Sequence, residues 1–246
     1  MSSHKVMVSN TAIAPTFTAS ARRLGLVSAG GTVLIIALYA AAMIAGLGTL
    51  QSPQQPIGTP WFSLMEILIL LLMPFMVGLM GAVHAWAPAE SRALTLLAGA
   101  FTTLLAGLTS SVHFVILALS RQAAFTGSAW QPLLSFQWPS VPYALDILAW
   151  DVFFALAVLF AAPVFRGSRL ANSVRVMLIA SGVLALAGLS GVLFGDMRLR
   201  AIGIVGYAGV FPLAVLLMAI LFYRSEPFGE VERLATRPST TAKLAS

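Results

Sequence analysis

Six long apolar runs constrain the fold of this chain more than any other feature. Each is roughly 20 residues long, and a helix of that length rises far enough to cross the about 30 Å of hydrocarbon in a bilayer. Lipid offers the backbone no hydrogen-bond partners, so each run is expected to be helical. The sequence therefore predicts an all-α, polytopic membrane bundle of six transmembrane helices. The runs lie near Gly25–Leu47, Phe62–Trp86, Ala93–Leu119, Tyr143–Phe165, Val176–Phe194 and Ala201–Tyr223.

Composition agrees with a membrane protein and excludes several chemistries. Hydrophobic residues make up 59% of the chain and charged residues 9%, whereas soluble domains carry about 25% charged residues. Because there is no cysteine, disulfides, thiolate metal sites and cysteine nucleophiles are excluded. The net charge of +6 does not indicate nucleic acid, because the cations lie between apolar runs and not on one basic face. The partner that the composition predicts is the lipid bilayer.

The distribution of the cations predicts how the chain threads the membrane. With a cytoplasmic N-terminus, only Arg121, Arg198 and Arg200 of the 14 Lys and Arg residues fall outside. Cytoplasmic loops are enriched in Lys and Arg, so we expect both termini in the cytoplasm and a multi-pass protein of the inner, cytoplasmic membrane. The predicted divisions are a disordered cytoplasmic tail over residues 1–24, a transmembrane domain over 25–223 and a cytoplasmic tail over 224–246.

The longest predicted connection, residues 120–142, is rich in aromatic residues and lies outside on this orientation. It contains Trp130, Phe136 and Trp138, and aromatic rings favour the level of the lipid headgroups. The segment is thus expected either to lie on the outer surface or to fold as a lid over a pocket.

Small residues recur at helical intervals in the fifth and sixth predicted spans. Such spacing lets two helix backbones approach closely, which drives helix association in lipid. We expect these two spans to pack in the interior of the bundle, and a hinge or gate beside Pro212 is the functional alternative. The small residues are Ala187, Gly191 and Gly195 in the fifth span and Gly203, Gly206 and Gly209 in the sixth.

The titratable residues of the spans converge on one layer. Counted along the helices, they lie roughly 5 to 12 Å below the outer boundary. A charge at the bilayer centre costs about 3 kcal/mol, so such residues mark a pocket, a pathway or an ion pair. We therefore predict an outward-facing acidic and histidine pocket between the second, third and fourth spans. The residues are Glu66, His113, Asp146 and Asp151, joined by Tyr207.

The fourth span carries two of these acids on different faces of a regular α-helix. Asp146 and Trp150 share a face, whereas Asp146 and Asp151 are roughly 140° apart. We expect one carboxylate to face the cavity and the other to pair with an arginine, and the deeper Asp151 is the expected cavity residue. Glu66 and Asp146 have a simpler alternative role, as favourable charges at helix N-termini.

The third span predicts a further part of the cavity wall. Small and polar side chains recur on one helical face, which favours a cavity lining with the histidine near its mouth. The stripe consists of Thr102, Ala106, Thr109 and His113.

Several cofactors are not expected. The only lysines, Lys5 and Lys243, lie in the predicted tails, so a retinal Schiff base has no partner. His84 and His113 lie towards opposite faces of the membrane, which argues against bis-histidine haem ligation. Only His4 remains, so a tri-histidine zinc site is also not expected. We predict no cofactor and no metal.

Two functions remain open, with a structural or regulatory subunit as a third. The first is a membrane protein that binds or transports a small lipophilic or cationic molecule. Proton coupling would run through a buried carboxylate, and the assembly considered for it is a homodimer. Its predicted ligand-binding residues are Glu66, His113, Asp146, Trp150, Asp151 and Tyr207.

The second function is a membrane-embedded acid–base enzyme acting on a lipid-soluble substrate, with Asp151, Glu66 and His113 as catalytic residues. The stretch Glu66-Ile-Leu-Ile-Leu-Leu-Leu-Met-Pro74 resembles the second span of the integral-membrane terpene cyclases of meroterpenoid pathways, where a Glu is followed eight residues later by Pro. The resemblance implies protonation of a prenylated substrate by a buried carboxylic acid. Those cyclases have seven spans and an acid in the last, both of which this chain lacks.

Overall fold

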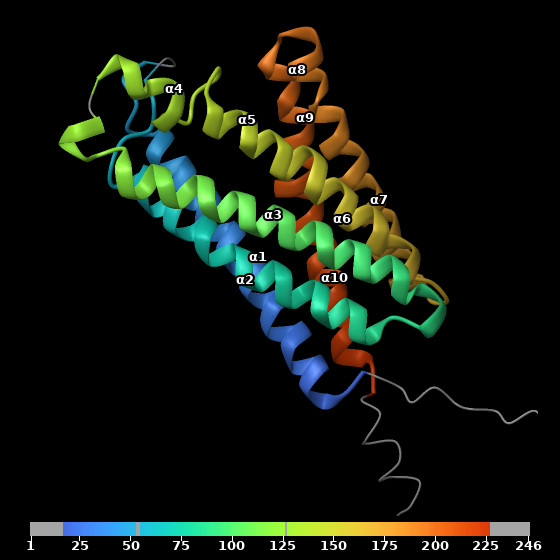
Figure 1. The fold of residues 1–246 in the computed structure, drawn as a ribbon. Helices are drawn as coiled ribbons and strands as arrows, with labels where there is room; N and C mark the ends of the chain where they lie inside the picture. Colours follow the sequence, from blue (N-terminus) through green and yellow to red (C-terminus); the bar gives the residue numbers. More distant parts are fainter. Residues whose placement is uncertain (1–16, 53–54, 126, 227–246) are drawn as a thin grey trace, which may run out of the picture.

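The computed structural model describes residues 17–52, 55–125 and 127–226. Within these ranges the chain is helical and contains six helices that are long and apolar enough to cross a membrane (Figure 1). The predicted all-α, polytopic six-helix fold is confirmed. The six spans are Ala19–Leu47, Trp61–Trp86, Ala89–Leu119, Val141–Val164, Arg169–Phe194 and Met197–Arg224.

The first three spans are α1 (Ala19–Leu47), α2 (Trp61–Trp86) and the pair η1 (Ala89–Ser91) and α3 (Arg92–Leu119). The long connection that follows holds η2 (Ala123–Phe125), η3 (Ser128–Trp130) and α4 (Gln131–Leu134). The fourth span consists of α5 (Val141–Ile147), η4 (Leu148–Phe153), α6 (Phe154–Ala161) and η5 (Ala162–Val164). The fifth consists of α7 (Arg169–Gly188) and α8 (Ser190–Phe194), and the sixth of η6 (Met197–Arg200), α9 (Ala201–Ile204), η7 (Val205–Val210) and α10 (Phe211–Arg224).

Two helices begin well before the apolar runs that predicted them. α1 starts at Ala19 and α7 at Arg169, because the hydroxyls of Thr18 and Ser168 cap their first turns. A capping hydroxyl fixes the start of a helix whatever the hydropathy of the next residues. The last residues of the predicted 1–24 tail therefore belong to the first span.

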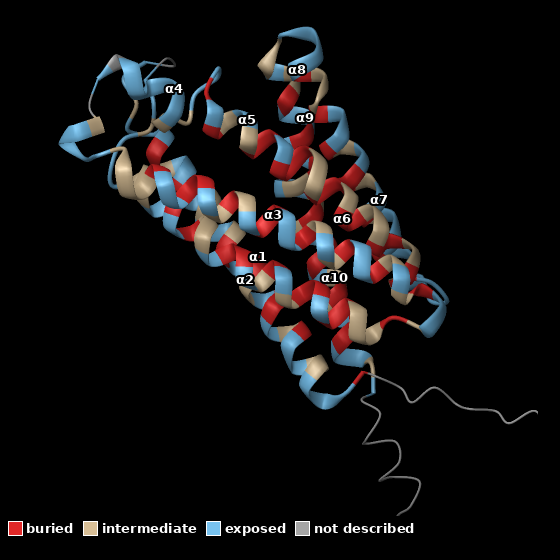
Figure 2. Cartoon of the chain, viewed as in Figure 1, coloured by how far each residue is buried: buried red, intermediate tan, exposed pale blue. Residues whose placement is uncertain are grey.

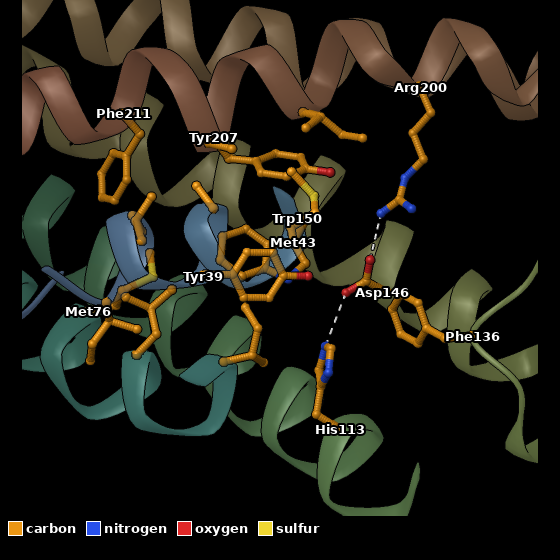
Figure 3. Close-up of a pocket in the computed structure, with 17 residues that line it drawn as sticks. Tyr39, Met43, Met76, His113, Phe136, Asp146, Trp150, Arg200, Tyr207 and Phe211 are labelled. Atoms are coloured by element: carbon orange, nitrogen blue, oxygen red, sulfur yellow. Dashed lines mark hydrogen bonds and ion pairs between the residues drawn. The ribbon is translucent and has the colours of Figure 1, made fainter. Parts of the chain in front are cut away.

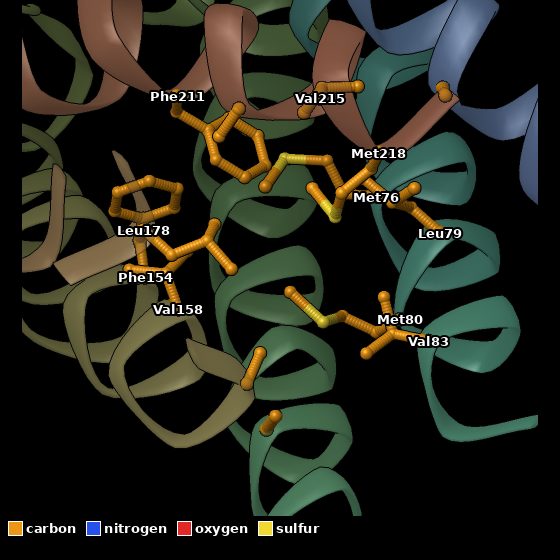
Figure 4. Packing of buried hydrophobic residues seen from close by; sticks show 14 of the residues in the cluster. Met76, Leu79, Met80, Val83, Phe154, Val158, Leu178, Phe211, Val215 and Met218 are labelled. Atoms are coloured by element: carbon orange, nitrogen blue, oxygen red, sulfur yellow. The ribbon is translucent and has the colours of Figure 1, made fainter. Parts of the chain in front are cut away.

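The six spans close into a ring. Each packs against its neighbour in the chain, and α10 returns to pack against both α7 and α1. The interior is apolar, and Figure 4 shows Phe154, Phe211 and Met218 meeting between the helices. Large apolar side chains are also exposed on the outside of the bundle, among them Leu193 and Phe194. Figure 2 shows exposed residues along the outer faces of the helices. An apolar exterior suits a protein surrounded by lipid.

The start of the first span and the end of the sixth lie next to each other. The Arg22 guanidinium donates to the Tyr223 carbonyl, and the rings of Phe17 and Phe222 lie 5.8 Å apart. The first and last spans thus begin and end on the same side, as an even number of crossings requires (Figure 1). The remainder of both predicted tails, residues 1–16 and 227–246, lies outside the described residues.

The predicted close approach of the fifth and sixth spans occurs, at partly different residues. A Cβ on Gly203 would lie 3.2 Å from the Cα of Gly188, and one on Gly206 would lie 2.7 Å from the Ser181 carbonyl oxygen. Only glycine fits at these two positions of the sixth span. A Cβ on Gly209 would meet nothing nearer than 3.9 Å, so that residue takes no part.

The stripe predicted for the fifth span is wrong at two of its three positions. Ala187 is exposed, and Gly195 ends α8 in the left-handed conformation with φ 70°. The four-residue spacing fails because α7 stops at Gly188 and a separate short helix follows. Gly191 remains buried.

The orientation prediction can be tested by cysteine labelling, since the native chain has no cysteine. Gln122 and Glu90 are both exposed, and they lie in connections at opposite ends of the bundle. In sealed right-side-out vesicles, a membrane-impermeant maleimide should label Gln122→Cys at once and Glu90→Cys only after permeabilisation. The reverse order would contradict a cytoplasmic location of the termini.

Candidate functional site

A cavity of about 250 Å³ lies inside the ring, lined by residues of five spans and of the long connection (Figure 3). Its two ends differ in chemistry. His113, Asp146 and Arg200 gather at one end, whereas Met76 and Phe211 lie at the other. The polar end points towards the side on which α4 and α8 lie, away from the described chain ends (Figure 1).

Five ionisable side chains form a continuous network at the polar end. His113 Nδ1 lies 2.9 Å from Glu66 Oε2, and its Nε2 lies 3.6 Å from Asp146 Oδ1. Arg200 completes the network, with Nη2 2.6 Å from Asp146 Oδ2 and Nε 3.3 Å from Asp151 Oδ2. None of the five side chains is more than 9% exposed. The network joins the second, third, fourth and sixth spans.

Arg200 is the central cation of this network, a role that the sequence did not predict. The sequence placed it at the outer mouth, yet it is only 4% exposed and its guanidinium lies 4.5 Å from the centre of the Tyr143 ring. Asp196 instead pairs with Arg198, whose Nη2 lies 2.9 Å from Asp196 Oδ2. Hydrogen bonds from the Arg198 side chain and from the Arg198 backbone N–H, followed by the charge of its guanidinium, lower the pKa of Asp196. This connection thus holds two arginines but a single acid. Arg198 pairs with that acid, and Arg200 points into the bundle.

The network carries an excess of negative charge by simple counting. Three carboxylates face one guanidinium, so even a doubly protonated His113 leaves a formal charge of −1 when every acid is ionised. An unbalanced charge in a low-dielectric interior is unfavourable, and such groups take up a proton or a counter-ion.

A widened helical turn explains why both acids of the fourth span reach the same arginine. In η4 the Phe154 N–H bonds to the Ala149 carbonyl five residues back, the pattern of a π-helix. Residues five apart are then close to one turn apart, so Asp146 and Asp151 both contact Arg200. The predicted separation of roughly 140° was wrong because it assumed 3.6 residues per turn throughout.

Asp151 lies behind the cavity wall, which corrects the expectation that it faces the cavity. It is fully buried, and a Cβ on Gly188 would lie 2.5 Å from its Oδ1. A Cβ on Gly203 would come still closer to the same oxygen, so the carboxylate occupies space that two glycines leave open. Among the described residues this Oδ1 has no hydrogen-bond partner. Asp146 is the carboxylate that lines the cavity.

Glu66 also lies behind the wall, where it supports His113 from the second span. Its carboxylate accepts a hydrogen bond from His113 Nδ1, which directs the other ring nitrogen towards the cavity. His113 Nε2 is buried and has no hydrogen-bond partner within the described part of the chain. Of the predicted site residues, His113, Asp146, Trp150 and Tyr207 line the cavity.

A second π-helical turn places the aromatic wall. In η7 the Phe211 N–H bonds to the Gly206 carbonyl five residues back, and Pro212 has no N–H with which to continue a regular helix. This turn carries Tyr207, whose ring lies 5.1 Å from that of Trp150 in η4. The two widened turns therefore meet across the cavity, and π-helical turns are frequent at functional sites.

The long connection was expected to be either a lid or a surface segment, and each interpretation holds for some of its residues. Phe136 lines the cavity and lies 5.2 Å from the His113 ring, as a lid would. Trp130 and Trp138 are exposed, as expected of residues that lie on the surface.

The stripe predicted on the third span is buried along its whole length, which confirms that its members share an inward face. Only His113 reaches the cavity. Thr102 instead donates to the Ala98 carbonyl of its own helix. No group of three or more His, Cys, Asp or Glu side chains in the described ranges is arranged to hold a metal ion.

Fold and site together define a polytopic helical membrane protein with a buried acidic network at one end of an apolar cavity. Comparison with protein-family models, curated proteins and solved structures finds no match. Its function therefore has to be inferred from the chemistry of the cavity.

Removing the charge of Arg200 should strongly destabilise the protein. Arg200→Met leaves Asp146 and Asp151 without their cation, and breaking a buried ion pair costs about 3–5 kcal/mol. We expect a large drop in melting temperature in detergent, partly recovered by adding Asp146→Asn.

Arg198→Met is the matched control, because Arg198 lies two residues away and pairs with Asp196 at the surface. Exposed pairs contribute little, so its melting temperature should stay close to that of the wild type. Equal losses in the two arginine variants would contradict the central role of Arg200.

Proposed function

We propose that this protein binds a small lipophilic cation in the cavity, from the outer side of the cytoplasmic membrane, and exchanges it for a proton. The observation that carries the proposal is the excess negative charge of the buried network at the polar end of an otherwise apolar cavity.

The charge of the network favours a cation over an anion or a neutral molecule. A monovalent cation beside Asp146 would bring the formal charge of −1 to zero. Charges interact strongly where water is excluded, so this neutralisation is the main source of selectivity. An anion would meet Arg200 and His113 at the cavity surface, but the three carboxylates of the network outnumber these two groups.

The wall of the cavity favours a lipophilic body on that cation. Apolar side chains such as Leu72 and Met76 line most of the surface, with the rings of Tyr39, Trp150 and Tyr207 between them and the polar end. Aromatic faces attract cations, and quaternary ammonium groups are bound by cages of such rings. A few convergent polar groups in an apolar cavity are typical of small-molecule sites.

Proton exchange follows from the same charge balance. When no cation is bound, one proton on the network gives neutrality, and an arriving cation makes that proton dispensable. The inner half of the bundle is filled by core side chains, among them Leu79, Phe154 and Met218. The described conformation thus suits a ligand that occupies the half of the bundle on the side of α4 and α8, and passage across the membrane would need a second conformation.

A second candidate is an acid–base enzyme, and one observation favours it. The Glu66 carboxylate orients His113 so that Nε2 lies buried at the cavity, 3.6 Å from Asp146 Oδ1. A carboxylate that holds a histidine with its other nitrogen turned towards the substrate site is the arrangement of a general acid–base catalyst. Glu66 would then act through His113 and would not protonate a substrate directly, in contrast to the role that the resemblance to terpene cyclases implies.

Asp146→Asn should lower the affinity for a lipophilic cation by roughly tenfold or more, since an interaction with a charged partner contributes about 1.5–3 kcal/mol. Benzyltrimethylammonium is a suitable probe, with binding measured by titration calorimetry on purified protein in nanodiscs. Asp196→Asn is the control, because this acid is exposed outside the cavity, and it should leave the affinity unchanged. Equal affinity in the wild type and Asp146→Asn would contradict the proposal.

A further inference from the structure

We infer that the ligand enters sideways from the bilayer, through an opening between α1 and the segment formed by α9 and η7, and that it carries an alkyl chain. This inference rests on the proposed function, because it takes the cavity as the site of a lipophilic cation. It adds the route of entry and narrows the ligand to a single-chain alkylammonium amphiphile.

The exposure of the lining residues locates the opening. Met43, Ile204 and Ala208 are the three lining residues that are exposed, at 38% and 43% for the first two. Met43 belongs to α1, and the other two belong to α9 and η7. The cavity therefore reaches the lateral surface of the helix bundle, between the first and sixth spans.

Helix packing explains why an opening forms at this level. α1 packs along α2 and α10, whereas α9 and η7 pack against α7. The contact between the first and sixth spans thus runs along α10, in the half of the bundle that holds the described chain ends. Towards the polar end of the cavity the sixth span is drawn to the fifth, where Gly188 and Gly203 meet.

The border of the opening is apolar. Next to its exposed lining residues stand Ile44 on α1 and Val205 on η7, which are 68% and 55% exposed. A mouth that admits water would be bordered by polar side chains, whereas this border matches the hydrocarbon that surrounds a membrane span. Ala40 and Ala208 contribute only methyl groups to the lining, so the opening has room for a chain.

These features fit an amphiphile whose ammonium group lies against Asp146 and the aromatic wall. Its alkyl chain would run past the alanines and out between the helices into lipid. A lipid-borne ligand of this kind reaches its site without leaving the bilayer, while a short-chain cation must arrive from water. The two sources share one ammonium chemistry and can be separated experimentally.

Trp150 provides the measurement, because it lines the cavity and is only 7% exposed. In a protein with the other four tryptophans replaced by Phe, a dodecyltrimethylammonium brominated near its head group should quench Trp150 fluorescence on entering the cavity. The protein is reconstituted in vesicles, and the rate of quenching is followed after mixing. Displacement of the brominated amphiphile by benzyltrimethylammonium, added from water, reports binding of the short cation.

Ala208→Phe should slow quenching by the brominated amphiphile at least tenfold, because the larger side chain fills the opening that the methyl group leaves. Val183→Phe is the matched control, since Val183 is 53% exposed on α7 of the fifth span and neither lines the cavity nor borders the opening. It should behave like the parent protein.

Each remaining outcome overturns the inference in a recognisable way. If Ala208→Phe leaves the quenching rate unchanged while both cations bind, entry is from water, and the proposed function stands without the lateral route. If Val183→Phe slows quenching as much as Ala208→Phe, the effect is not specific to the opening. If neither cation reaches Trp150 in the parent protein, the lateral route and the proposed function both fail.

Discussion

The buried guanidinium of Arg200 is the interaction on which the rest of the site depends. It contacts Asp146 and Asp151 of the fourth span from the first turn of the sixth, and so fixes the distance between two helices that are otherwise apolar. In a membrane interior the loss of one partner leaves a charge that water cannot solvate, so each member of the network holds the others in place. The network is therefore both structural and the source of the cavity's charge.

The backbone is adapted to this network in two ways. A π-helical turn in the fourth span brings its two acids to the same arginine, and a second one in the sixth span presents Tyr207 to Trp150. Gly188 and Gly203 leave the space that Asp151 fills. These glycines also draw the sixth span towards the fifth and away from the first. The same helix contact therefore makes room for Asp151 and leaves the gap between the first and sixth spans.

The sequence predicted the parts of this arrangement that follow from hydropathy and regular helix geometry. The six spans and the inward face that carries His113 were found in this way. The role of Arg200 was missed because hydropathy assigns an arginine at a helix end to the surface, and nothing in the sequence shows that Asp196 is already paired with Arg198. The roles of Asp146 and Asp151 were exchanged because a π-helical turn has no clear signature in the sequence. Pro212 was the one available signal, and it marked only the second turn.

The most direct test of the charge account is the number of protons released when a cation binds. Titration calorimetry with benzyltrimethylammonium in two buffers of different ionisation enthalpy gives this number for the wild-type protein. If the empty network is neutralised by a proton, binding should release one proton for each cation bound, and the observed heat should differ between the buffers accordingly. Binding with identical heats in the two buffers would contradict the account, because the cation would then add to the network without replacing a proton.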